Sequence, residues 1–348
     1  MLNPYKKADV SFEWIRDLDE QGCFSRVYLA HDEHLDYDLV IKEIKKEENT
    51  NPDDYFSEAR MLYKNAHPNI VQVQYAAQCD RNIYIAMPFY YNGSLNQLMQ
   101  IKNLTCREII RYSIHFLSGL YHIHSKGLMH FDIKPNNIML SNRDEAMLSD
   151  FGLSQLINEE SRATPQFGYN FHMPPEYFAL SSNDYNFTFD IYQACLTLYR
   201  MCVGYHQFEA ERAVFSTIEQ LKNAIIDGSY PLRQFPAHIH KKLISIVNKC
   251  IHIDPNQRYQ SVLDILNDLS AINDGALDWR LQTAKPVNGT YEWQKELDGA
   301  ILSLVFDSES ASTTGKRLYP DSRQRRVTDL AITSGCTHAK LYKLLKDN

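Results

Sequence analysis

The sequence predicts an α+β protein: a small β-sheet with one helix, then a larger and mainly helical part, then a small C-terminal α/β appendage. Three observations lead to this fold class. Short apolar runs typical of strands fill residues 10–90, helical periodicity dominates from residue 93 to 271, and a more polar and irregular composition follows. We place the boundary of the last part near residue 275.

The N-terminal part is predicted as a sheet with one helix. V-Y-L-A (27–30) and L-V-I-K (39–42) are apolar runs separated by a polar stretch, which predicts a β-hairpin. Two further runs, I-V-Q-V (70–73) and I-Y-I-A-M (83–87), are also typical of strands. Residues 52–64 place apolar side chains at helical spacing behind an acidic first turn, as at the start of a helix.

The middle part is predicted to be helical. Thr105, followed three residues later by Glu108, forms a capping-box pattern before a long amphipathic segment that ends near Lys126. Helical spacing of apolar residues returns in four segments: 190–202, 216–227, 238–251 and 261–271. With 348 residues, the chain is long enough for one two-lobed domain or two smaller ones.

Charge is divided unevenly along the chain. The formal net charge of −7 argues against a protein whose whole surface binds nucleic acid or an anionic membrane. Residues 311–348 nevertheless hold eight Lys and Arg residues against three acidic ones. We therefore expect this basic C-terminal segment to dock on the acidic body of the protein or on a partner.

The seven cysteines include no Cys-x-x-Cys pair, which favours free thiols over a disulfide framework or a zinc site. The first residues lack the apolar core of a signal peptide, and no run approaches the roughly 18 apolar residues that a membrane span needs. We expect a cytoplasmic protein that contacts no membrane.

Five charged and polar residues have the types and order that phosphoryl transfer requires. This reaction asks the protein to place charge around a triphosphate and its metal ion rather than to supply covalent chemistry. Lys42 ends a predicted strand, and Glu58 lies on the predicted first helix. Asp132 and Asn137 stand five residues apart after the long helix, and Asp150 opens D-F-G-L-S. These spacings allow a base and two metal ligands to converge.

Eight short motifs follow one another along the chain: V-I-K (40–42), E-A-R-M-L (58–62), H-P-N-I-V (67–71), H-F-D-I-K-P-N-N (130–137), S-D-F-G (149–152), P-P-E (174–176), D-I-Y (190–192) and D-P-N-Q-R (254–258). In this order they resemble the signatures of the eukaryotic-type (Hanks-type) Ser/Thr protein kinases. The resemblance covers about residues 12–272. It implies the two-lobed protein kinase fold, with an N-lobe over about 12–87, a C-lobe over about 91–272, and an accessory segment over 276–348.

The resemblance also implies a role for each catalytic residue. Lys42 would contact the α- and β-phosphates of ATP and pair with Glu58. Asp132 would orient the substrate hydroxyl and accept its proton, while Lys134 would neutralise charge on the transferred phosphoryl group. The family resemblance implies a protein substrate, and Lys134 in I-K-P (133–135) resembles the Ser/Thr-specific branch rather than the tyrosine-specific one.

The implied cofactors are ATP and Mg²⁺. Asn137 and Asp150 would hold the metal. Met87 would stand at the back of the adenine pocket, and the adenine would contact the Pro88 carbonyl and the Tyr90 backbone. The full set of implied cofactor-binding residues is Gly22, Val27, Lys42, Met87, Pro88, Tyr90, Asn137 and Asp150.

The chain departs from the family pattern in two loops. The expected G-x-G-x-x-G reads E-Q-G-C-F-S (20–25), so only Gly22 remains where close approach to phosphate favours glycine. Tyr169 follows Gly168 where the pattern has Gly-Thr, so the kind of substrate that this loop faces is not decided by the pattern. A pseudokinase scaffold or binding module, or a kinase for a non-protein substrate, therefore stays as an alternative to an active Ser/Thr protein kinase.

Phe131 replaces the Arg that precedes the catalytic Asp in many kinases and that receives a phosphate from the activation segment. Because Phe carries no charge, we expect that phosphorylation of Ser161 or Thr164 is not the on-switch. We expect the ring to pack against apolar neighbours instead.

Three other polar residues are interpreted as structural. Glu176 and Arg258 are expected to form a buried ion pair, and Asp190 is expected to accept hydrogen bonds from loop backbone groups. None of the three is assigned to the chemistry.

The C-terminal segment offers two patterns. I-L-S-L-V-F (301–306) is typical of a strand, whereas residues 327–346 resemble a helix-turn-helix with a break at Gly335. Nucleic acid therefore stays open as a less expected partner. R-R-V-T (325–328) either resembles a basic phosphorylation consensus or is a solvated charge run that opens a helix at Thr328.

Overall fold

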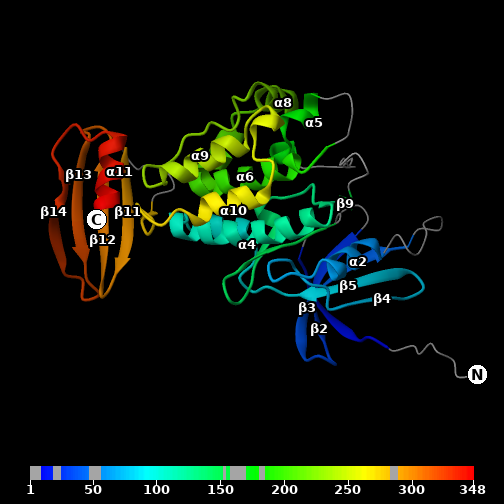
Figure 1. Cartoon of the computed structure of the whole chain (residues 1–348). Coiled ribbons are helices and arrows are strands. Elements are labelled where there is room, and N and C mark those ends of the chain that lie inside the picture. The colour runs from blue at the N-terminus through cyan, green and yellow to red at the C-terminus, as the bar shows by residue number, and fades with distance from the viewer. Residues whose placement is uncertain are drawn as a thin grey trace, which may run out of the picture.

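The computed structural model describes residues 9–18, 25–46, 56–151, 154–156, 170–179, 185–282 and 289–348. Figure 1 shows the N-terminal sheet at one end, the helices in the middle and a second sheet at the C-terminal end. The predictions about Gly22, Ser161, Thr164 and Tyr169 lie outside the described residues. The side chain of Glu58 is also not described, although its backbone lies in a helix.

The N-terminal lobe is a five-stranded antiparallel sheet in the order β1-β2-β3-β5-β4. Its elements are β1 (Phe12–Asp17), β2 (Ser25–Asp32), β3 (Tyr37–Lys45), α2 (Ser57–Lys64), β4 (Tyr75–Gln78) and β5 (Asn82–Pro88). The predicted hairpin is confirmed as β2 and β3, and the strand at 83–87 is confirmed as β5. Of the helix predicted at 52–64, residues 57–64 form α2.

The strand predicted at residues 70–73 is wrong. Ile70 and Val71 are buried, but they pair with Leu148 of the second lobe rather than with the N-terminal sheet. The Val71 amide donates to the Leu148 carbonyl over 2.9 Å. The apolar run thus joins the two lobes, and the sheet strand begins only at Tyr75.

The second lobe is mainly helical. Its helices are α3 (Leu95–Ile101), α4 (Cys106–Ser125), α5 (Pro175–Ala179), α6 (Thr188–Val203), α7 (Tyr205–Arg212), α8 (Ile218–Asp227), α9 (Lys241–Cys250) and α10 (Val262–Ser270), with 3₁₀ turns at Pro135–Asn137, Asn170–His172 and Pro255–Gln257. The lobe also contains two short antiparallel strand pairs: β6 (Leu128–Met129) with β9 (Gln155–Leu156), and β7 (Ile138–Leu140) with β8 (Ala146–Leu148). The four predicted helices and the capping box of Thr105 and Glu108 are confirmed.

Helix α6 is the centre of this lobe, because all of its residues are buried. Helices α4 and α9 pack against it, and α10 packs on α4 and α9 in the same hydrophobic cluster. Among the described residues, no helix combines the length and apolar character needed to cross a bilayer.

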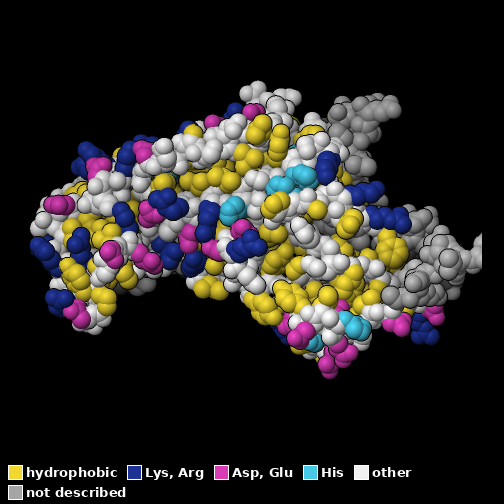
Figure 2. Space-filling model, turned by 60° about the horizontal axis from the view of Figure 1, so that its bottom comes forward, with side chains coloured by type: hydrophobic (Ala, Val, Ile, Leu, Met, Phe, Trp, Pro, Cys, Tyr) yellow, Lys and Arg dark blue, Asp and Glu magenta, His cyan; other side chains and the backbone are white. Residues whose placement is uncertain are grey.

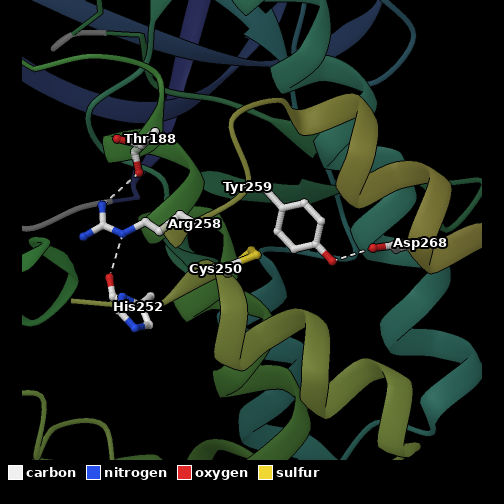
Figure 3. The surroundings of a disulfide bond; sticks show 7 residues. Thr188, Cys250, His252, Arg258, Tyr259 and Asp268 are labelled. Carbon is white, nitrogen blue, oxygen red and sulfur yellow. Dashed lines mark hydrogen bonds between the residues drawn. A yellow bond between two sulfur atoms is a disulfide. The ribbon is translucent and has the colours of Figure 1, made fainter. Parts of the chain in front are cut away.

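The expectation that all cysteines are free thiols is wrong for one pair. Cys195 of α6 and Cys250 of α9 are joined by a disulfide, although they are 55 residues apart in the sequence. Figure 3 shows that Cys250 lies near Arg258, which donates hydrogen bonds to the carbonyls of His252 and Thr188. Helix packing brought the two thiols together, and spacing along the chain carried no signal of it.

The C-terminal module is a five-stranded antiparallel sheet with one helix. Its elements are β10 (Arg280–Leu281), β11 (Thr290–Leu297), β12 (Ala300–Asp307), β13 (Ser312–Leu318), β14 (Gln324–Ile332) and α11 (His338–Asp347). The strand predicted at 301–306 is confirmed within β12, and the α/β appendage is confirmed. Figure 2 shows Lys and Arg side chains spread over this module among acidic ones.

The helix-turn-helix pattern at 327–346 is wrong in its first half, because residues 327–332 belong to strand β14. Leu330 of this strand is fully buried, and its Cβ would lie 2.3 Å from a Cβ placed on Gly315 of β13. The missing side chain at Gly315 therefore lets the two strands approach. Thr328 is an exposed strand residue and opens no helix.

The module contacts the helical lobe through a mixed interface. Trp293 of β11 is buried, and its Nε1 donates to the His238 Nδ1 of the lobe over 3.0 Å. Within the module, Trp279 is fully buried, and its Nε1 donates to the Leu345 carbonyl of α11 over 2.7 Å. Arg107 of α4 binds Asp278, and Glu108 of α4 binds Arg280. The contacts with α4 thus use charges of both signs, and from the basic segment 311–348 Lys346 pairs with Asp274 over 3.1 Å.

Substituting Trp279 with Ala should lower the free energy of unfolding by about 3–5 kcal/mol, because it removes a large buried side chain and leaves a cavity. Trp14→Ala is the matched control, since Trp14 is 51% exposed and should change stability by about 0.5 kcal/mol or less. Urea denaturation followed by circular dichroism measures both. Equal losses in the two variants would contradict the structural role of Trp279.

Candidate active site

Three predicted residues meet in the loop between β6 and β7. The Lys134 Nζ lies 3.0 Å and 2.8 Å from the two carboxylate oxygens of Asp132. The Asn137 Nδ2 donates to the Asp132 Oδ2 and to the Asp132 carbonyl, each over 2.8 Å. Lys134 therefore contacts both carboxylate oxygens of Asp132, and Asn137 shares Oδ2 with it.

Two further predicted site residues, Lys42 and Asp150, form an ion pair that joins the two lobes. The Lys42 Nζ on β3 lies 3.6 Å from the Asp150 Oδ1, which follows β8. Asp150 has a left-handed backbone, with φ +61°, and non-glycine residues adopt this region rarely. Because Ser149 donates both its amide and its hydroxyl to the Asn137 carbonyl, the Asp150 segment is fixed beside the Asp132 loop.

Of the remaining predicted cofactor residues that the structure describes, three lie on strands of the sheet that contains Lys42. Val27 of β2 pairs with Lys42, and on β5 Met87 pairs with Val40 and Pro88 pairs with Leu39. The Tyr90 carbonyl, just past β5, accepts the Gly93 amide over 2.9 Å.

One carboxylate holds the backbone of the Asp132 loop. Asp190, at the start of α6, accepts the backbone amides of His130 and Phe131, each over 2.8 Å. Burial alone would raise the pKa of the Asp190 carboxyl, but the hydrogen bond from His124 and the amide bonds outweigh it and hold this pKa below its ordinary value. Asp190 is thus the structural acceptor that its sequence position predicted.

Phe131 has a left-handed backbone, with φ +67°, which is rare for a bulky residue. Its amide donates to Asp190, and its carbonyl accepts from the Gln193 Nε2 over 3.0 Å. Its ring is fully buried in a cluster with Met129, Met173, Tyr185 and Phe189. The prediction that Phe131 packs against apolar neighbours is confirmed.

His130 connects the Asp132 loop to the Asp150 segment. The ring Nε2 of His130 lies 3.1 Å from the Ser149 carbonyl, and the ring meets Phe151 edge-on with centroids 4.8 Å apart. Burial lowers the pKa of His130, so the neutral ring is favoured at this position.

The buried ion pair of Glu176 and Arg258 is confirmed as a bidentate contact, with two distances of 2.7 Å. Sequence reasoning missed Gln193, which donates to the Phe131 carbonyl and accepts the Ile133 amide over 3.1 Å. Gln193 stands three residues after Asp190 on α6, so the two side chains share one helix face. This three-residue spacing from Asp190 was the sequence signal from which the role of Gln193 could have been inferred.

The comparisons with known proteins agree with this geometry. The family model of the protein kinase domain matches residues 20–268. The chain belongs to the protein kinase family. It is 27% identical over 276 residues to a probable CTD kinase subunit alpha homolog of Encephalitozoon cuniculi, covering 73% of this chain and 82% of the relative.

Two further relatives are named as serine/threonine kinases. A probable serine/threonine-protein kinase of Clostridium acetobutylicum is 27% identical over 260 residues, covering 73% of this chain and 38% of the relative. The serine/threonine-protein kinase AtPK1/AtPK6 of Arabidopsis thaliana is 26% identical over 292 residues, covering 82% of this chain and 60% of the relative. The chain therefore spans less than two thirds of these two relatives.

Substituting Phe131 with Arg should destabilise this kinase by about 3–5 kcal/mol, because it places an uncompensated cation in a closed apolar cluster. Phe131→Leu keeps an apolar side chain at the same backbone angle and should cost about 1.5 kcal/mol or less. Denaturation midpoints of the two variants measure the difference. An Arg variant as stable as the Leu variant would contradict the apolar role assigned to this position.

Proposed function

We propose that this kinase transfers the γ-phosphoryl group of ATP, with Mg²⁺, to a serine or threonine hydroxyl of a protein. The main support is the joint placement of Asp132, Lys134 and Asn137 in one hydrogen-bonded group, with the Lys42–Asp150 pair joining the two lobes. Few reactions other than phosphoryl transfer need a cation, a carboxylate and a carboxamide so close together.

Asp132 would act on the substrate hydroxyl. Its carboxylate is oriented by Lys134 and Asn137, so one oxygen can hold the hydroxyl proton as the oxygen–phosphorus bond forms. Lys134 would place positive charge beside the transferred group, where negative charge is spread in the transition state. Because these side chains already hold their positions before the reaction, they need to move little to reach the transition state.

Asn137 and Asp150 fit a magnesium ion by their chemistry. Mg²⁺ prefers oxygen ligands and is bound in such sites by one or two carboxylates together with phosphate oxygens. The amide nitrogen of Asn137 is directed at Asp132, which leaves its amide oxygen as the donor atom for a metal. When bound, the ion would neutralise charge on the phosphates.

Lys42, with Glu58 as its proposed partner, would bind the α- and β-phosphates. The adenine would lie against the β-strand segment that contains Met87 and Pro88, with Gly22, Val27 and Tyr90 as further contacts. Pro88 has no amide hydrogen, so it can take part only through its carbonyl oxygen. These assignments carry over the family pattern to matching positions of this sequence.

Two alternatives rest on the altered loops. A pseudokinase scaffold would keep the fold without useful turnover, as the loss of two glycines around Gly22 allows. A kinase for a non-protein substrate is compatible with Tyr169 in the substrate-facing loop. The retained set of Lys42, Glu58, Asp132, Asn137 and Asp150 favours the active kinase over the scaffold.

The role of residues 276–348 and the cytoplasmic location remain predictions. The contacts of Trp293, Asp278 and Arg280 with the helical lobe support a module that stays docked on it. Nucleic-acid binding has lost its main support, because the predicted recognition motif is half strand.

Asp132→Asn should reduce transfer of labelled phosphate by at least about a hundredfold, since the amide cannot accept the hydroxyl proton. Asp254→Asn is the matched control, because Asp254 caps the 255–257 turn and Asn caps equally well. Incorporation of ³²P into a general protein substrate measures both variants. Equal incorporation by wild type and Asp132→Asn would remove the active-kinase proposal and favour the scaffold.

Replacing Ser161 and Thr164 with Ala together should leave the rate within about threefold of wild type. The reason is that Phe131 provides no cation to bind an activation-segment phosphate. The same assay on phosphatase-treated wild type gives an independent value. A hundredfold loss, about 2.7 kcal/mol of barrier, would mean that another cation takes the part of the missing Arg.

A further inference from the structure

A groove of about 620 Å³ lies at the junction of the helical lobe and the C-terminal module. Helix α7 and the segment 232–237 form the wall on the side of the lobe, and β11, β12 and α11 form the wall on the side of the module. Small-molecule sites commonly occupy such volumes at the boundary between two folded parts. None of the residues assigned to phosphoryl transfer lines this groove.

The walls of the groove are mostly apolar and aromatic. Tyr291 and Trp293 of β11 stack with ring centroids 6.0 Å apart, and Phe306 of β12 lies 6.3 Å from Tyr291. On the opposite wall, Val214 and Leu232 are 71% and 51% exposed. Side chains of this kind at a concave surface are suited to the apolar body of a ligand.

One carboxylate stands in this apolar lining. Glu211 is only 4% exposed, and it accepts hydrogen bonds from the Tyr199 hydroxyl, the Gln207 amide and the Leu232 backbone amide. All three donors are neutral. Burial raises the pKa of Glu211, which reflects a carboxylate without a compensating cation.

The described lining of the groove carries negative but no positive formal charge. Among the lining residues that the structure describes, Glu211 is the only one with a formal charge at neutral pH, and the other titratable side chains are His206, His338 and Tyr291. Neither Lys nor Arg occurs in this described lining. A positive charge would therefore have to come from the ligand.

We propose that this groove binds a small organic cation, an ammonium group carried on an apolar body. The ammonium would compensate the buried charge of Glu211, and the body would cover Val214, Leu232 and the aromatic row. Aromatic rings also attract cations through their negative faces. This site is separate from the proposed kinase chemistry and does not depend on it.

Three soluble probes of nearly the same shape test the charge requirement: phenethylammonium, phenethyl alcohol and 3-phenylpropanoate. The readout is the indole N–H signal of Trp293 in protein labelled at tryptophan with ¹⁵N, identified by its loss in Trp293→Phe. The chain has three tryptophans, so the spectrum holds few indole signals. The proposal expects saturable shifts with the cation, at least about tenfold weaker binding of the alcohol, and none of the anion.

Glu211→Gln should remove the preference for the cation over the alcohol, because Gln keeps an acceptor for Tyr199 but has no charge. Glu209→Gln is the matched control, since Glu209 lies on the same helix, pairs with Arg212 and does not line the groove. Alcohol binding as tight as cation binding in wild type would overturn the proposal, whether or not the Glu211 variant folds. A cation preference that survives Glu211→Gln in folded protein would overturn it as well.

Discussion

The arrangement of the active site depends on the Asp190 carboxylate. It accepts the amides of His130 and Phe131 from a fully buried position at the start of α6, the helix around which the lobe is packed. A left-handed backbone at a bulky residue costs about 1–3 kcal/mol. Hydrogen bonds to a charged acceptor contribute about 1.5–3 kcal/mol each, so the two amide bonds can offset that strain. The same carboxylate therefore fixes the backbone from which Asp132 projects.

Phe131 acts together with this hydrogen bonding. Its amide and carbonyl are bound by Asp190 and Gln193, and its ring is enclosed by apolar side chains that include Phe189 of the same helix. Three separate contacts from α6 thus hold one residue. We propose that a loop held in this way needs no phosphate to order it, which would allow an apolar residue at a position where the family pattern has Arg.

The sequence predicted the parts of this site that depend on local spacing. Asp132 and Asn137 are five residues apart in one loop, so their proximity could be expected, and Asp190 was recognised as a backbone acceptor from its motif. Gln193 was missed because its role exists only once α6 packs beneath the loop. Residues 70–73 were misassigned because their partner is in the other lobe, and Cys195 meets Cys250 only through helix packing. V-T-D-L-A-I has apolar residues at spacings that fit a helix or a strand, and the pairing of β14 with β13 decided for the strand.

Amide hydrogen exchange at His130 and Phe131, in protein freed of phosphate and without nucleotide, tests most directly whether Asp190 holds this loop in advance. The account predicts that both amides exchange as slowly as those in the middle of α6, such as Leu196, and that Asp190→Ala selectively accelerates them. Exchange within about tenfold of the rate of an unstructured peptide, or equal protection in Asp190→Ala, would contradict it.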